Sequence, residues 1–254
     1  MGLDKDNDAQ EAFNMIDYFK RNGVLVKELK EDTGTYKKGD LVIDMAQAKR
    51  GYANHILYKG SNESAWAAMY AELLVNFPDM KGFKAEPVFN DGLFAGKLGE
   101  VTTTRATRTS EIDPKAPYYV IANTSASAVQ AVNKAISQGK SVYLTDDGYI
   151  VDRDTFASLL PNYAIYGEAL YKVPNGPTLK PLKIYSPNYH YDWTGVDAPA
   201  HTSLVLEKLG FQIVDTPDEA DVIVLENNRF DASIFGKKPT LVIGGEAMQK
   251  LEKL

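Results

Sequence analysis

Apolar residues spaced three and four apart predict helices in several parts of the chain. The first is capped by Asp8, with Glu11 three residues on, and ends at Asn22-Gly23. Four more predicted helices follow in order: one capped by Asp44 and ending at Gly60, one from Trp66 to Phe77 ending at Pro78, one through Val129, Val132 and Ile136, and one through Leu204, Val205 and Leu209.

Short β-branched and aromatic runs between these helices predict strands. The predicted strands are Val24–Leu29, Leu41–Ile43, Tyr118–Ala122, Ser141–Leu144, Tyr149–Val151, Leu182–Tyr185, Phe211–Val214, Val222–Leu225 and Thr240–Ile243. A stretch rich in Gly and Thr near 84–116, with candidate strands at Ala85–Phe89 and Lys97–Thr103, predicts a β-rich insertion. Strands that alternate with helices predict an α/β fold with an open, mostly parallel sheet.

The segment Val173–Pro181 contains three prolines and a glycine, which is typical of a linker. We therefore expect two regions. Residues 1–176 form an α/β region with the β-rich insertion, and residues 177–254 form a separate parallel-sheet unit.

Three segments follow strands of the second unit: Ser186–Trp193, Glu226–Arg229 and Gly244–Ala247. Parallel strands place such segments at one carboxyl edge, where α/β sheets bind ligands. Aromatic rings there suit stacking, and amides and carboxylates suit orienting a peptide or sugar, although the rings could instead fill the edge themselves. The candidate ligand residues are Asn188, His190, Asp192, Trp193, Asn227, Asn228 and Glu246.

Composition narrows the classes of partner and chemistry. The 254 residues are 44% hydrophobic, as in a globular protein with a substantial core, and the net charge of −6 predicts no nucleic-acid partner. No apolar run approaches the roughly 18 residues of a membrane span. The chain has no cysteine, which excludes disulfides and thiol nucleophiles and fits an exported protein.

Several segments together resemble the region downstream of the catalytic domain in secreted bacterial zinc carboxypeptidases of the carboxypeptidase A/T-like kind. They are GDLVIDMAQAKRGYANHILYKGSNES, YYVIANTSASAVQAVNKAISQGKSVYL, LKIYSPNYHYDWTGVDAPAHTSLVLEKLGFQIV, DVIVLEN and LVIGGEA. The resemblance covers most of the chain. It implies that residues 177–254 form a flavodoxin-like, class I glutamine amidotransferase-like unit, with Gly244–Gln249 where that fold has its Gly-x-Cys-x-Gly elbow.

The chain departs from both catalytic patterns. Glu246 stands where the resemblance places the nucleophilic cysteine. The peptidases bind zinc through a His-x-x-Glu pair, and none of the three histidines here has a glutamate three residues on. We therefore identify no catalytic residue and no metal ligand, and expect zinc only in an upstream catalytic domain that this chain does not contain.

The resulting expectation is a non-catalytic accessory region of an extracellular zinc carboxypeptidase, which binds or positions a peptide or cell-wall glycan and has the upstream catalytic domain as its partner. One alternative is a self-contained hydrolase of the amidotransferase superfamily that uses Glu246 and His190. Another is a structural spacer whose edge is filled by its own side chains.

Overall fold

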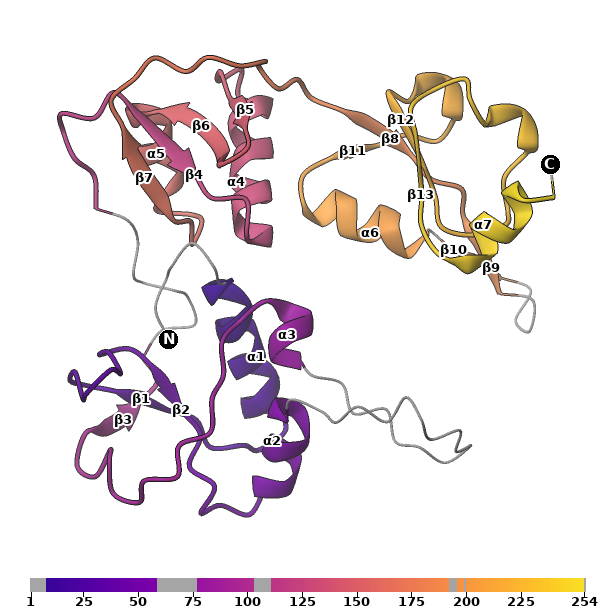
Figure 1. Cartoon of the computed structure of the whole chain (residues 1–254). Coiled ribbons are helices and arrows are strands. Elements are labelled where there is room, and N and C mark those ends of the chain that lie inside the picture. Colours follow the sequence, from indigo (N-terminus) through magenta and orange to yellow (C-terminus); the bar gives the residue numbers. More distant parts are fainter. Residues whose placement is uncertain (1–7, 59–76, 103–110, 192–195, 199, 254) are drawn as a thin grey trace.

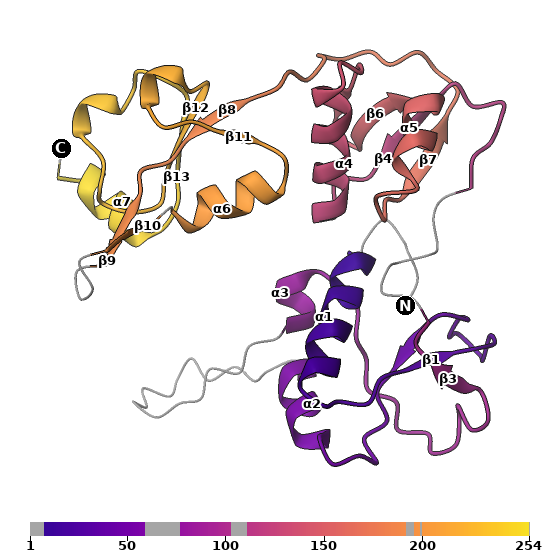
Figure 2. The same ribbon diagram turned by 180° about the vertical axis from the view of Figure 1, so that it is seen from behind.

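A computed structural model describes residues 8–58, 77–102, 111–191, 196–198 and 200–253. The described residues form seven α-helices and several sheets around three hydrophobic cores, so the fold is mixed α/β. Figures 1 and 2 show these cores as three successive bodies along the chain. None of the helices in the described ranges has the length and apolar character of a membrane span.

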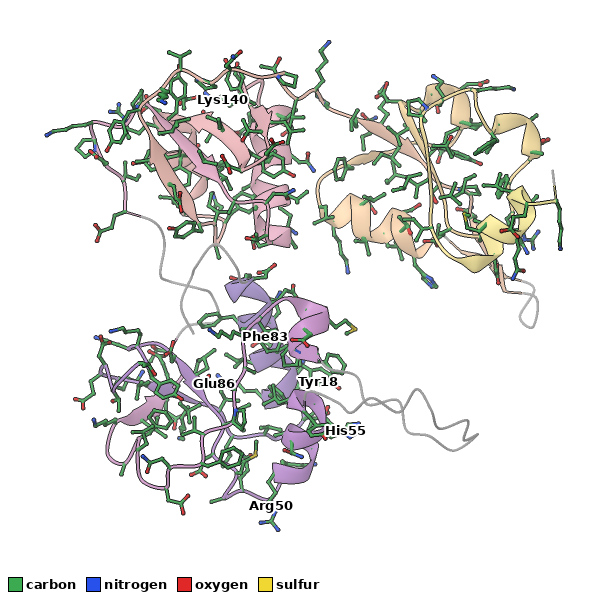
Figure 3. All side chains as sticks on the ribbon, in the orientation of Figure 1. Tyr18, Arg50, His55, Phe83, Glu86 and Lys140 are labelled. Atoms are coloured by element: carbon green, nitrogen blue, oxygen red, sulfur yellow. The ribbon has the colours of Figure 1, made fainter. Side chains whose placement is uncertain are left out.

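The N-terminal body packs helices on one side of a small antiparallel sheet of order β2-β1-β3. Its elements are α1 (Ala9–Arg21), β1 (Lys27–Leu29), β2 (Leu41–Val42), α2 (Arg50–Leu57), α3 (Phe77–Lys81) and β3 (Leu98–Glu100). The apolar face of α1 is buried as the periodicity predicts, and Phe83 completes this core beside the helices (Figure 3). Asp8 caps α1 by accepting a hydrogen bond from the Glu11 N–H (3.2 Å), which confirms the predicted start.

Three predictions for this body need correction. Asp44 does not cap α2, because its carboxylate accepts the Ala46 N–H (2.8 Å) in a local turn and α2 begins only at Arg50. Within the predicted insertion, residues 85–89 form no strand, and β3 is the only strand among the described residues of 84–116. Pro78 lies within α3 instead of ending a helix, while residues 66–76 of the predicted stripe lie outside the described residues.

The middle body is a four-stranded sheet of order β5-β6-β4-β7. Its elements are β4 (Tyr118–Ile121), α4 (Ala126–Ser137), β5 (Tyr143–Thr145), β6 (Gly148–Asp152), α5 (Arg153–Leu159) and β7 (Gly167–Leu170). The fully buried Tyr119 and Phe156 rings stack at 4.3 Å between centroids. Asp146 and Asp147 make the predicted turn into β6.

The prediction of a mostly parallel sheet is wrong for these first two bodies, in which every strand pair of the described residues is antiparallel. In the middle body, β4 and β5 run in the same direction, as expected for strands joined by α4. However, the turn after β5 sends β6 between them, and β6 pairs antiparallel with both. Apolar periodicity does not encode which strands become neighbours, so the sequence pattern could not reveal this insertion.

The C-terminal body contains the parallel sheet, of order β11-β8-β12-β13. Its main elements are β8 (Lys183–Tyr185), α6 (His201–Lys208), β11 (Gln212–Ile213), β12 (Val222–Leu225), β13 (Thr240–Val242) and α7 (Gly245–Leu251), with short 3₁₀ turns at Pro217–Glu219 and Ala232–Ile234. All four predicted strands are confirmed within one or two residues. The predicted long loop after β8 instead contains a hairpin of β9 (Tyr189–Tyr191) and β10 (Val196–Ala198).

Part of the predicted linker is attached to the middle sheet. Thr178 forms a bridge with Tyr143 of β5, and the Leu179 N–H donates to the Val142 carbonyl (2.8 Å). Leu179 also packs against the middle core. The chain therefore leaves the middle body close to β8, and the division at residue 177 stays a prediction.

Candidate functional site

The candidate site lies at the carboxyl edge of the parallel sheet, where the segments that follow three strands meet. The Asn227 side-chain amide, just after β12, donates a hydrogen bond to the Pro187 carbonyl just after β8 (3.1 Å). A Cβ built on Gly244, just after β13, would lie 3.6 Å from the Glu226 carbonyl oxygen, which is van der Waals contact. The sequence-predicted convergence of these segments is therefore present in the structure.

This edge includes the point where the order of strands reverses. From β8 the chain passes through α6 to β11 on one side, and it then returns across β8 to β12 and continues outward to β13. The connections from β8 and β12 therefore diverge, which leaves a crevice beyond the ends of these two strands in open α/β sheets. Ser186 and Glu226 directly follow the two strands concerned.

Glu226 connects the sheet edge to the beginning of α6. The residue that precedes this helix is Ala200, whose side chain cannot accept a hydrogen bond. Instead, one carboxylate oxygen of Glu226, Oε2, accepts the Thr202 N–H (2.8 Å) and also the Thr202 hydroxyl. A carboxylate at this position is further stabilised by the partial positive charge of the helix N-terminus.

Two polar atoms at this edge are buried without a hydrogen-bond partner among the described residues. They are the second carboxylate oxygen of Glu226, Oε1, and the hydroxyl oxygen of Ser186, a residue only 6% exposed. Buried polar atoms in native proteins are nearly always paired, so two orphans at one sheet edge need an explanation. Because Oε1 can only accept while it is ionised, its missing partner must be a donor, whereas Ser186 can donate or accept.

Of the predicted residues, Asn227 is the one that the structure places inside the edge. It is 1% exposed, and its side chain both donates to Pro187 and accepts the Arg229 N–H (2.8 Å). The amide therefore holds two loops in place. Asn188 and Asn228 are exposed, and the Asn228 carbonyl accepts a hydrogen bond from the Lys250 ammonium of α7 (2.7 Å).

Three other predicted residues cannot be placed as side chains in the site. His190 lies on β9, in register with Asp197 of β10, and the structure describes the backbone there. Asp192 and Trp193 lie outside the described residues. The aromatic part of the predicted crevice therefore stays a prediction.

The strand–turn–helix elbow predicted from Gly244-Gly245 is present. Gly244 has φ of 85°, a conformation that disfavours other residues, and α7 begins immediately after it. Glu246 is exposed on the first turn of α7, while Ala247 beside it is fully buried in the core of this body. No described hydrogen bond or ion pair joins Glu246 to Glu226 or Ser186.

Ser186 and Glu226 lie in the segments that the sequence predicts for the sheet edge, but their side chains were not predicted as site residues. Thr202 was not predicted to lie at this edge. A signal was present in VIVLEN, where a carboxylate directly follows a fully apolar strand. A second signal was the absence of a capping residue at Ala200, since a helix without its own cap needs an acceptor from elsewhere.

The described residues contain no group of three or more His, Asp or Glu side chains placed to hold a metal ion. Comparison with known proteins adds no assignment: no family model, no curated protein and no solved structure matches the chain.

Proposed function

We propose that this chain is a non-catalytic accessory region of a secreted zinc carboxypeptidase, and that it binds a peptide or cell-wall glycan at the carboxyl edge of its parallel sheet. The observation that carries the binding role is the pair of buried, unpaired atoms, Ser186 Oγ and Glu226 Oε1, at the reversal point of the sheet. The attachment to a carboxypeptidase rests on the sequence resemblance alone. It implies that zinc belongs to an upstream catalytic domain.

The finer description of the fold is part of the same proposal. In order of sequence, the four parallel strands are arranged 2-1-3-4, which agrees with the first four strands of the flavodoxin-like order. The elbow at Gly244 occupies the position at which an amidotransferase-like unit would present its nucleophile. Both features support a flavodoxin-like, amidotransferase-like unit.

The proposed non-catalytic role rests on the residue at the elbow. The chain contains no cysteine, and the residue at the position of the nucleophile is an exposed glutamate. A carboxylate in water is a weak nucleophile. It is also a poor general base at neutral pH unless its surroundings raise its pKa. Ligand binding at this edge requires no nucleophile. It requires only a hydrogen-bond donor for Glu226 Oε1 and a hydrogen-bond partner for the Ser186 hydroxyl. Peptide N–H groups and sugar hydroxyls supply both.

The first experiment measures zinc content and the turnover of peptides with a free C-terminal residue, with and without added zinc. We expect neither stoichiometric zinc nor turnover. Binding is then tested by NMR titration of the 254-residue chain with soluble peptidoglycan fragments, in parallel with the stem peptide alone. Binding of the fragments but not of the stem peptide would identify the glycan as the ligand.

Three substitutions make the binding test specific. Ser186→Ala and Glu226→Gln each change one of the unpaired groups, and each should weaken binding by about tenfold, as expected for a hydrogen bond to a charged or buried group. Thr202→Val is the matched control, because it removes the hydroxyl bound to Oε2 and leaves Oε1 unchanged. Binding that is equally strong in all three variants would exclude this site.

The elbow geometry favours one alternative, a self-contained hydrolase that uses Glu246 and His190. Turnover of any amide or ester substrate that Glu246→Gln abolishes would support it and would overturn the accessory role. In the accessory region there is no turnover for Glu246→Gln to abolish. If peptide and glycan both fail to bind and no turnover is seen, the remaining interpretation is a structural spacer.

A further inference from the structure

The junction between the middle and C-terminal bodies contains a second candidate site, separate from the sheet edge. Helix α4 of the middle body faces the C-terminal end of α6, and Figures 1 and 2 show the two helices as neighbours from both sides. The Gln130 and Asn133 amides of α4 donate to the carbonyls of Lys208 (3.1 Å) and Leu209 (2.8 Å). Two of the carbonyls that a helix leaves unpaired at its C-terminus are thus bound across the junction.

The two bodies also approach each other closely at Gly210. This residue has φ of 90°, and a Cβ built on it would lie 3.1 Å from the Cβ of Asn133. Glycine therefore serves two purposes here, since it ends α6 in the left-handed conformation and leaves room for α4. The relative position of the two helices is consequently defined by specific contacts.

A cavity of about 340 Å³ lies beside these contacts. Lys134 and Ser137 of α4, Tyr163, and Lys208 of α6 line it together with the bridging amides. The lining contains two ammonium groups and no carboxylate, in a chain whose net charge is −6. Within the described part of the chain, neither lysine takes part in an ion pair.

We propose that this cavity, named here the junction pocket, binds a small oxyanion, the chemistry shared by phosphate and carboxylate ligands. Lys134 and Lys208 supply charge from different bodies, and the Tyr163 hydroxyl adds a neutral donor, whereas the Ser137 hydroxyl already donates to the Lys134 carbonyl (2.8 Å). A ligand held by both lysines bridges α4 and α6, so its binding stabilises the junction. The pocket lies at the C-terminal end of α6, about 12 Å of helix away from Glu226, and it does not depend on the proposed function.

The competing explanation is that both lysines only complement the partial negative charge at the ends of their helices. In that case an added anion would compete for them without a defined site. The two explanations differ in whether binding saturates and whether it needs both lysines.

The test is an NMR titration of the full chain with inorganic phosphate and, separately, with citrate, against chloride at constant ionic strength. We expect saturable shifts confined to α4 and the end of α6. Lys134→Gln and Lys208→Gln should each weaken binding at least about tenfold. Both lysines are exposed, so neither change should affect folding.

Lys140→Gln is the matched control, because it removes the same charge just beyond α4, at the upper side of the middle body in Figure 3. Tighter binding of phosphate or of citrate identifies the kind of oxyanion. Shifts that do not saturate with either anion, or that weaken equally in all three variants, would overturn the proposal.

Discussion

Replacing Asp8 by alanine should destabilise the protein more than the loss of an ordinary helix cap, because this carboxylate connects two bodies. Oδ1 accepts the Glu11 N–H at the start of α1, and Oδ2 accepts the Ala126 N–H at the start of α4 (2.9 Å). The residue is only 4% exposed, so both hydrogen bonds are made by a carboxylate that is largely withdrawn from water.

The size of the effect follows from these two contacts. A lost N-cap costs about 1 kcal/mol. A hydrogen bond to a charged group contributes about 1.5–3 kcal/mol. The desolvation of the carboxylate offsets part of this contribution. We therefore expect Asp8→Ala to lower the free energy of unfolding by about 2–4 kcal/mol.

The assay is urea denaturation followed by circular dichroism, with Ser125→Ala as the control. Ser125 caps α4 by accepting the Ala128 N–H (3.1 Å), and no hydrogen bond joins its side chain to the described residues of the first body, so its loss should cost about 1 kcal/mol. If Asp8→Ala costs no more than Ser125→Ala, the bond between bodies contributes nothing and the reasoning fails.

Asp8 also has a distinctive dependence on pH. Burial raises its pKa above the ordinary value of 3.8, although the Ala126 and Glu11 N–H groups act in the opposite direction. Because burial favours the protonated form in the folded state, the part of the stability that is linked to this pKa shift is fully present below pH 3.8 and is lost as the pH rises through the folded-state pKa. The stability of the wild type relative to Asp8→Asn should therefore fall as the pH rises from 3.8.

Two further predictions test the middle body. Asp152 should show the opposite trend. Burial acts to raise its pKa, but hydrogen bonds from the Thr155 hydroxyl (2.7 Å) and N–H (2.8 Å) lower this pKa below 3.8 overall. The stability of the wild type relative to Asp152→Asn is therefore present above pH 3.8 and lost as the pH falls further, and a stability difference that stays constant between pH 2 and 5 would contradict this. Gly167→Ala should cost about 1–3 kcal/mol in urea denaturation, because its Cβ would lie 2.4 Å from the buried Phe156 ring. Gly51→Ala, in helix α2 with open space around its Cβ beyond the helix's own backbone, should be neutral or slightly stabilising. An equal effect of the two changes would refute the steric explanation.

The sequence alone determined the local structure wherever side chains act on their own segment. The cap at Asp8, the end of α1 at Asn22-Gly23 and the turn at Asp146-Asp147 are formed by short-range hydrogen bonds and by glycine conformations, and all are present. The strands of the C-terminal sheet were equally predictable, since short, mainly apolar runs favour the strands of a parallel sheet.

Only the tertiary structure decided which strands became neighbours and which distant groups met. The insertion of β6 between β4 and β5 made the middle sheet antiparallel, although the local pattern is the same as that of a parallel unit. The cap of α6 comes from Glu226, 24 positions from Thr202, and Asp8 reaches Ala126 over 118 positions. Local periodicity carries no information about such contacts, because burial of the whole chain selects them. For the same reason, only the folded structure of the sheet edge shows that the Ser186 hydroxyl and Glu226 Oε1 are buried and unpaired among the described residues.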